Sequence, residues 1–579
     1  MYTTEPGYRQ GFIALFVQDD WKVTPKLTLN LGLRWEIPLP QTEAFNRMSG
    51  IDNTLPNPDA DGFPGAVTYL GNCPTCNGRT SFQDSYYREV GPRFGVAYNA
   101  AKNLVLRGGY GISYSPPIWN NFGTHNIQGF NGTVNVAKGT SPTGFTLDPA
   151  TYWSTLTGAP LPPSALVGLP PFQGPLPDRS PTIANGTGID FLPLKSLAQP
   201  YTQNWSAGFQ YQFPRDIVLE ADYVGSKGTR LLQSMFSNMF NQAPSQYMPL
   251  GDILAMPLAD ALADPATAAT LAQYGITKLP YPSFATTNFN PTVAQALRPF
   301  PQYDVVTNNF PTMGLSTYNS LQVSARKRTS HGLSFIAAYT YSKTLTNSDT
   351  ALYYPTGGFG IYNFGQNFYD RRAEKSIAAF DYPQVFKFTW IYELPFGSGK
   401  HWLNSGGRLN YLVGGWTVTG IQIYRSGTPL SIVTEQCTGI YSGAYGDGCS
   451  VRANIVPGVP QTMPLKGLDA VNGTPYLNPA AFVDPPLSPN NGYAMEFGSA
   501  PRFLPNIRGP GFQGEDFGVL KDTRFGERFD FQVRADFFNV FNRTGRGDPV
   551  TDVDGGSFGL IFGPAHGPRI IQLAMRLNF

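Results

Sequence analysis

The sequence RIIQLAMRLNF, which runs from Arg569 to Phe579, gives the first indication of the fold. Every second residue in it is apolar, and this apolar face consists of Ile571, Leu573, Met575, Leu577 and Phe579. A period of two is the period of a β-strand. An apolar face opposite Gln, Arg and Asn is expected for a strand with lipid on one side and water on the other. The same pattern fits the last strand of a soluble β-sandwich, so the other segments must decide between the two.

The composition is typical of aromatic-faced strands joined by irregular loops. The 579 residues include 31 Tyr, 41 Phe, 63 Gly and 52 Pro, whereas only 14% are charged. The formal net charge is +2 and Lys and Arg form no runs, which argues against a nucleic-acid partner. No stretch approaches the roughly 20 consecutive apolar residues that a membrane helix needs, so any membrane span must consist of shorter, alternating strands.

Twelve further segments alternate in the same way and bring the predicted number of strands to thirteen. They are residues 12–20, 27–36, 93–99, 104–114, 203–213, 217–224, 319–328, 333–342, 386–393, 416–424, 513–520 and 529–538. In the segment 416–424 the alternation changes phase near Gly420, which predicts a β-bulge there.

The connections between these segments alternate between short and long. The short ones are mostly tight turns, such as 100–103 and 214–216, whereas the long ones, such as 114–202 and 225–318, are rich in Pro, Gly and Asn. This asymmetry is typical of outer-membrane barrels, which have short periplasmic turns and long extracellular loops. Within the long loops, only residues 251–275 predict a helix.

The amino-terminal sequence predicts that a larger protein precedes this portion. MYTTEP contains no basic segment, no apolar core and no cleavage site, so it does not predict a signal peptide. Bacterial single-chain barrels have even strand numbers, whereas thirteen is odd. We therefore expect residues 1–579 to be the carboxy-terminal portion of a barrel domain.

Blocks spread over nearly the whole chain resemble the Oar-like TonB-dependent receptors. They are FVQDDWKVTPKLTLNLGLRWE (16–36), GPRFGVAYNAAKNLVLRGGYGISY (91–114), LEADYVGSKGTRL (219–231), YNSLQVSARKRTSHGLSFIAAYTYSKTL (318–345), LPFGSGK (394–400), GGW (414–416) and RADFFNVFNR (534–543). The resemblance implies an all-β, transmembrane antiparallel barrel of about 22 strands in the bacterial outer membrane. It also implies a signal peptide, a regulatory-like domain and a plug, none of which this sequence matches. Contact with TonB is therefore expected only through a missing N-terminal part.

The terminal segment also resembles the signal that the barrel-assembly machinery of the outer membrane reads. The residues that carry this resemblance are Leu573, Met575, Leu577 and Phe579. We expect lipid and the assembly machinery as partners, together with an extracellular ligand whose identity the sequence does not give.

Charged residues on the polar faces of the predicted strands are candidates for lining the lumen. They are Arg34, Arg107, Glu220, Asp222, Arg326, Arg534, Asp536 and Arg576. They could line a transport path, but the simpler interpretation is that they pair with one another or with a plug.

The densest charge cluster in the sequence lies just before a predicted strand. It is the segment YDRRAEK, with Asp370, Arg371, Arg372 and Glu374. These residues could contact a ligand or plug in the mouth of the barrel. The simpler interpretation is a salt-bridged loop base, which we favour.

The cysteines and histidines predict no catalytic or metal site. Cys73, Cys76, Cys437 and Cys449 fall in long loops, where two local disulfides are favoured over a four-thiolate zinc site. The four His are scattered, and the sequence contains no HExxH, GxSxG or GxxxxGK[ST] motif. We expect no cofactor and no enzymatic activity. Two functions remain open, ligand uptake across the outer membrane and adhesion through the long loops.

Overall fold

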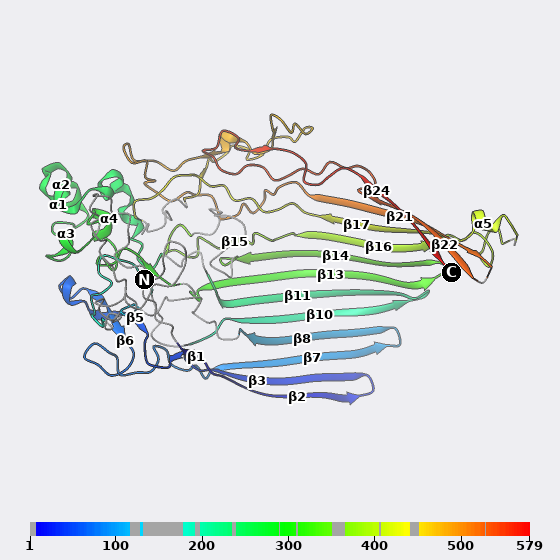
Figure 1. Ribbon diagram of the computed structural model, residues 1–579, viewed down its shortest axis with the longest axis horizontal. Coiled ribbons are helices and arrows are strands. Elements are labelled where there is room, and N and C mark those ends of the chain that lie inside the picture. The colour runs from blue at the N-terminus through cyan, green and yellow to red at the C-terminus, as the bar shows by residue number, and fades with distance from the viewer. Residues whose placement is uncertain are drawn as a thin grey trace, which may run out of the picture.

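The computed structural model describes residues 7–115, 128–130, 178–190, 197–233, 239–288, 290–308, 311–349, 365–404, 407–440, 451–526 and 528–579. Its dominant element is one antiparallel sheet of fourteen strands. Figure 1 shows these strands as long arrows that lie side by side and curve as a group.

Thirteen of the fourteen strands pair in sequence order. They are β2 (Phe12–Thr24), β3 (Leu27–Pro38), β7 (Glu89–Ala101), β8 (Leu104–Tyr114), β10 (Tyr201–Phe213), β11 (Ile217–Leu231), β13 (Gly314–Ser330), β14 (Leu333–Thr346), β16 (Gln384–Glu393), β17 (Trp416–Arg425), β21 (Phe512–Phe525), β22 (Phe529–Phe538) and β24 (Ile570–Asn578). The short β15 (Ser376–Ile377) pairs with β14. The thirteen predicted strands are confirmed, and β2 and β24 form the two edges of the sheet.

The sheet has two chemically different faces, because the strand register places apolar residues of one strand beside apolar residues of the next. The pairs Trp390↔Gly420, Gly420↔Phe517, Phe517↔Phe537 and Phe537↔Ile571 continue one mostly apolar row over five strands. We call this side the apolar face. The opposite side carries most of the charged strand residues and is called the polar face.

The β-bulge predicted near Gly420 is wrong. Strand β17 keeps a continuous register with β16 and with β21 through Gly420. A Cβ at Gly420 would lie 2.5 Å from Nε1 of Trp390, so the glycine leaves space for the indole ring. The indole in turn donates a hydrogen bond of 3.2 Å to Oε1 of Gln422, which stands on the apolar face. The break in alternation therefore reflects side-chain packing within a regular strand.

The short and long connections lie at opposite ends of the sheet, which we call the turn end and the loop end. Figure 1 shows the carboxy terminus and α5 (Asn410–Val413) at the turn end, and helices α1 to α4 at the loop end. None of the helices in the described ranges has the length and apolar character that crossing a membrane would require.

The described parts of the long connections fold into a layer over the loop end, and we call these parts the cap. The helix predicted over residues 251–275 is present as several pieces, of which α2 is capped by the Asp264 side chain, 2.9 Å from the amide nitrogen of Thr267. The helices of the cap are η1 (Pro58–Ala60), η4 (Ser245–Ala255), α1 (Leu258–Ala263), α2 (Pro265–Gln273), α3 (Phe284–Thr287), α4 (Val293–Ala296) and η6 (Pro479–Ala481). Its short strands are β1 (Tyr8–Arg9), β4 (Thr42–Glu43), β5 (Ser49–Pro56), β6 (Pro64–Tyr69), β9 (Ile189–Asp190), β12 (Val306–Thr307), β18 (Asn454–Ile455), β19 (Thr474–Pro475), β20 (Phe482–Val483) and β23 (Leu560–Ile561).

The largest buried apolar clusters lie in the cap and not in the sheet. The largest joins Leu254, Leu258 and Leu271 to Ile440 and Val451, which come from a different connection. Two further cores are built around Tyr69 with Tyr303, and around Phe482 with Phe558. The cap is therefore a folded layer with its own hydrophobic cores.

Candidate functional site: the polar face and the cap

Four of the predicted lumen residues form a charged ladder across strands β8 to β13. Nε and Nη2 of Arg107 lie 3.0 and 2.6 Å from the two carboxylate oxygens of Asp222. Nη2 of Arg107 also lies 3.5 Å from Glu220, which in turn lies 3.6 Å from Arg326. We call Arg107, Glu220, Asp222 and Arg326 the charged ladder.

A glycine makes this ladder possible. Strand β10 runs between Arg107 and Asp222, and Gly208 pairs with both of them. A Cβ at Gly208 would lie 2.1 Å from Oδ1 of Asp222 and 2.4 Å from the carbonyl oxygen of Ala221. The arginine thus reaches its partner over a strand position that has no side chain.

The ladder remains open to solvent. The side chain of Arg107 is 41% exposed and that of Arg326 is 57% exposed. Exposed ion pairs contribute only about 0–1 kcal/mol each. The ladder therefore adds little stability, but it gives this wall a hydrated surface of both charges.

The other predicted lumen residues interact within their own strands. Arg34 pairs with Glu36, and Nε of Arg534 lies 2.8 Å from Asp536. Nε of Arg576 donates a hydrogen bond of 2.8 Å to Asn578. The structure therefore brings together four of the eight predicted residues and leaves the other four as local pairs.

Two hollows lie beside strand β21. One, of about 330 Å³, is lined by Arg534 with Thr419 and Leu520. The other lies nearer the loop end and measures about 270 Å³. Its lining is largely apolar and includes Ile421, Ile423, Phe512, Phe538, His566 and Ile570.

The predicted mouth cluster divides into a buried residue and three exposed ones. Glu374 is completely buried, whereas Asp370, Arg371 and Arg372 are exposed. Glu374 accepts hydrogen bonds of 2.9 Å from Nη1 of Arg452 and from the amide of Gln366. This residue is therefore part of the support of the cap, and only its three neighbours are available to a ligand.

Two buried arginines that no local sequence pattern indicates, Arg452 and Arg502, contact Glu374. Arg502 donates to the carbonyl oxygens of Glu374 and Thr346, at 3.0 and 2.7 Å, and also pairs with Asp349. Nearby, Arg508 pairs with the buried Asp381. We call the pairs Arg452–Glu374, Arg502–Asp349 and Arg508–Asp381 the buried arginine pairs. Each pair joins the connection between β14 and β16 to the connection between β17 and β21.

A further buried carboxylate lies where the short strands β1 and β4 pair. Glu43 accepts hydrogen bonds from the guanidinium of Arg47 and from the amides of Gly7 and Phe45. Burial alone would raise its pKa, but these hydrogen bonds outweigh burial and lower the pKa to about 2. Burial and the adjacent Glu43 charge raise the pKa of Tyr8 to about 12.

Cys73, Cys76 and Cys437 lie in the cap. Cys73 and Cys76 form a disulfide, and Cys437 is also disulfide-bonded. Cys449 lies outside the described residues.

The residues of the predicted assembly signal lie on the apolar face of the edge strand β24. Leu573 and Met575 pair with Ala535 and Val533 of β22 and are 72% and 75% exposed. Leu577 is 54% exposed and Phe579 is 95% exposed.

A family model described as the outer membrane beta barrel domain matches residues 1–572. The chain belongs to this family. It is therefore an outer-membrane protein, whose apolar face meets lipid and whose polar face lines the lumen. The turn end is periplasmic and the cap is extracellular, as the lengths of the connections indicate.

Solved structures similar to the chain are outer-membrane receptors and transporters. The ferric citrate transporter FecA in its unliganded form is 10% identical, with 99% of this chain and 46% of that chain covered and a TM-score of 0.36. The ferric-catecholate import receptor Fiu from E. coli K12 is 11% identical, with 99% and 45% covered and a TM-score of 0.36. The outer membrane transporter YddB from Escherichia coli is 9% identical, with 98% and 54% covered and a TM-score of 0.37. The chain thus spans about half the length of these proteins, and a search of curated sequences found no match.

Proposed function

We propose that residues 1–579 form the barrel portion of an Oar-like TonB-dependent receptor that takes up a ligand across the outer membrane. The observation that carries this proposal is the charged ladder, because hydrated charges of both signs suit the wall of a water-filled passage. The seven sequence blocks described above support the Oar-like assignment. Energy coupling would come from a plug and a TonB contact in a part of the protein N-terminal to this barrel portion.

Three groups of residues would meet the ligand. Asp370, Arg371 and Arg372 are exposed in the cap. The hollow beside Phe512 and the charged ladder both lie on the polar face, the first beside β21 and the second across β8 to β13. A ligand with both apolar and charged groups fits these surfaces.

Uptake is tested by comparing three strains of the source bacterium: the parent, a deletion of this gene and a deletion of tonB. The probes are radiolabelled ferric siderophores, peptides and oligosaccharides, each supplied separately. We expect both deletions to abolish energy-dependent uptake of the same probe. Loss of uptake in the gene deletion but not in the tonB deletion would rule out TonB coupling.

The cap supports adhesion as a second candidate function. Its hydrophobic cores, of which the three largest are described above, hold the loops in a defined shape, and recognition of another surface requires such a shape. If the protein is an adhesin, deletion of the gene should reduce attachment of the cells to surfaces or to one another and leave the uptake of every probe unchanged.

A further inference from the structure

The connection between β16 and β17 differs from the other periplasmic turns. It spans residues 394–415, and its exposed apolar side chains are Trp402 (55%), Leu403 (52%), Leu409 (52%), Tyr411 (46%) and Leu412 (70%). The turns at 25–26, 102–103, 214–216 and 331–332 carry no exposed large apolar side chain. Figure 1 shows α5 of this connection beyond the ends of the strands. We call its described residues, 394–404 and 407–415, the foot.

The backbone holds the foot in a fixed shape. The amide of Trp402 donates to the carbonyl oxygen of Pro395 at 2.9 Å, and the amide of Gly397 donates to Trp402 at 3.0 Å. Gly415, with a φ of 72°, lies so close to β21 that a Cβ would be 2.0 Å from the carbonyl oxygen of Asp522. The exposed apolar side chains are therefore presented by an ordered segment that is docked on the sheet.

The foot adjoins the lipid-facing surface of the barrel. Tyr411 stacks on Phe525, with ring centroids 5.3 Å apart and planes inclined by 16°. Phe525 pairs with Phe529 in the apolar row of β21 and β22. The indole of Trp416, also on the apolar face, donates a hydrogen bond of 2.9 Å to the carbonyl oxygen of Leu412. Through these two contacts Tyr411 and Leu412 of the foot adjoin the apolar face of the strands.

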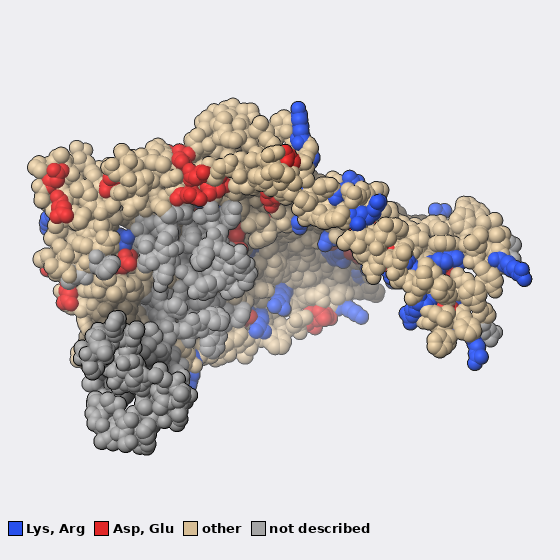
Figure 2. Space-filling view, turned by 45° about the horizontal axis from the view of Figure 1, so that its top comes forward, with Lys and Arg blue, Asp and Glu red and all other residues tan. Residues whose placement is uncertain are grey.

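Basic side chains lie beside this apolar surface. Lys400 and Arg408 belong to the foot, where Nζ of Lys400 lies 2.8 Å from Glu393, and the exposed Arg528 lies in the adjacent turn between β21 and β22. Nζ of Lys521 lies 5.7 Å from the centre of the Trp416 ring. Figure 2 shows Lys and Arg gathered at this end of the molecule, whereas Asp and Glu are more frequent over the cap. Positive charge beside exposed Trp, Tyr and Leu is the composition of a segment that lies in a membrane interface.

We propose that the foot is an interfacial anchor in the periplasmic leaflet of the outer membrane. Its apolar side chains enter the boundary between headgroups and acyl chains, and its Lys and Arg contact anionic phospholipid headgroups. The partner is lipid and not a periplasmic protein, because the apolar surface adjoins strands that already face lipid. This inference depends on the family and the topology, and it holds whether the barrel transports a ligand or mediates adhesion.

The test measures how fast a charged, water-soluble maleimide labels single cysteines introduced into the complete protein. Leu412→Cys reports on the foot, and Lys102→Cys, in a tight periplasmic turn, is the matched control. The purified protein is reconstituted in vesicles of phosphatidylcholine mixed with phosphatidylglycerol, and protein without an introduced cysteine gives the background. We expect the cysteine at position 412 to react about tenfold more slowly than that at 102, since an apolar side chain favours the lipid phase by at least that factor.

Two comparisons make the result decisive. Equal labelling rates at the two positions in these vesicles would overturn the proposal. If position 412 is protected from the maleimide in native outer-membrane fragments but not in pure lipid, a protein covers the foot. This result would also overturn the proposal. The double variant Arg408→Glu, Arg528→Glu, which leaves the Lys400–Glu393 pair intact, should lose protection at position 412 when phosphatidylglycerol is present. If this double variant stays fully protected, the assignment of anionic headgroups is wrong.

Discussion

Single buried charges hold the cap together. Glu374 is completely buried, and its carboxylate lies 2.9 Å from Arg452, which is itself only 5% exposed. A buried ion pair contributes little compared with two apolar residues, but removing one partner leaves a charge without compensation in a poorly solvated place. The buried arginine pairs therefore make the cap sensitive to the loss of a single side chain.

We expect the substitution Glu374→Gln to destabilise the cap by about 3 kcal/mol, because it leaves the guanidinium of Arg452 buried without a counter-charge. Amide hydrogen exchange at Gln366 and Arg452, in the folded barrel, measures this change. The matched control is Asp370→Asn in the same cluster, where the exposed carboxylate should contribute no more than about 0.5 kcal/mol. Equal effects of the two substitutions would contradict the assignment of Glu374 to a buried network.

The pKa of Glu43 predicts a pH dependence at the edge of the cap. It is lowered from 4.5 to about 2, so the ionised carboxylate stabilises the fold above pH 4.5, and this contribution disappears as the pH falls through 2. The amides of Phe45 and Arg47 donate to this carboxylate at 2.7 and 2.8 Å, so their exchange protection should fall over the same interval. In the variant Glu43→Gln, protection of both amides should be lower at neutral pH and independent of pH.

At the level of elements, the strands and the buried arginine pairs differ in how far the sequence predicts them. Alternation is local, so β8 (Leu104–Tyr114) and β22 (Phe529–Phe538) have the predicted bounds, β24 (Ile570–Asn578) is one residue shorter at each end, and the other strands are extended. The buried arginine pairs could not be predicted, because Arg452 and Glu374 are 78 residues apart and Arg502 and Asp349 are 153 apart. Nothing in the local pattern distinguishes these arginines from exposed ones. The role of Gly208 could not be predicted either, because it depends on Arg107 and Asp222, which lie on two other strands.

Gly208 gives a prediction about strand β10. The substitution Gly208→Ala places a methyl group 2.4 Å from the carbonyl oxygen of Ala221, so we expect a loss of about 1–3 kcal/mol and separation of Arg107 from Asp222. Gly111 on β8 is the control, because its Cβ would meet only atoms at 3.6 Å or beyond. Urea titration of the heat-modifiable, folded form measures both variants. A Gly208→Ala protein as stable as Gly111→Ala would show that the ladder does not need the glycine.

The edge strand β24 gives a prediction about assembly. Phe579 is 95% exposed, so its removal should leave the packing of the folded sheet unchanged. If it is read by the barrel-assembly machinery, its deletion in the complete protein should reduce the amount of heat-modifiable barrel in outer-membrane fractions several-fold. Deletion of Phe579 with no change in that amount would remove this role. Arg576→Gln, on the polar face of the same strand, is the control and should assemble normally.

At the scale of the whole molecule, the two ends of the sheet face different compartments. Protease added to intact cells should cut only in extracellular segments, and the connection between β11 and β13, residues 232–313, is the main candidate because its helices are part of the cap. The foot should stay intact until the outer membrane is permeabilised. Cleavage within 394–415 in intact cells would reverse the topology, and peptide mapping by mass spectrometry distinguishes the two results.

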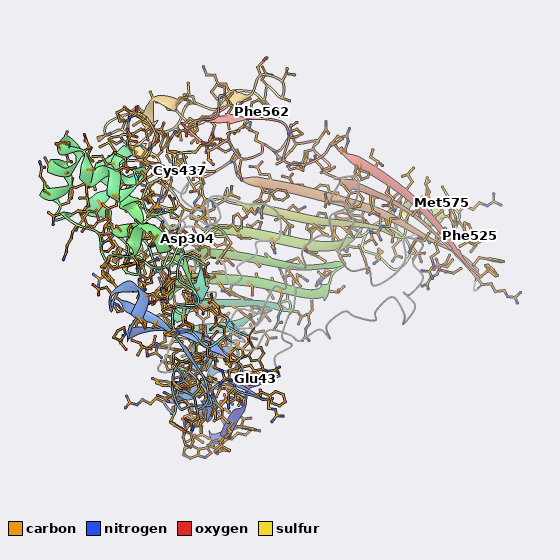
Figure 3. The ribbon with its side chains drawn as sticks, turned by 60° about the vertical axis from the view of Figure 1, so that its left-hand side comes forward. Glu43, Asp304, Cys437, Phe525, Phe562 and Met575 are labelled. Atoms are coloured by element: carbon orange, nitrogen blue, oxygen red, sulfur yellow. A yellow bond between two sulfur atoms is a disulfide. The ribbon has the colours of Figure 1, made fainter. Side chains whose placement is uncertain are left out.

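The buried arginine pairs also couple neighbouring connections at the mouth of this barrel. Each pair joins two connections, and the largest core of the cap joins Leu258 and Leu271 to Ile440 and Val451. If one loop swung away alone, it would separate a buried charge from its partner and open a hydrophobic core at the same time. The three connections that these contacts join, β11–β13, β14–β16 and β17–β21, are therefore coupled, because none of them can be displaced alone without breaking buried contacts. The view in Figure 3, where Cys437 and Asp304 lie close to the helices of the same layer, shows how closely the connections are packed there.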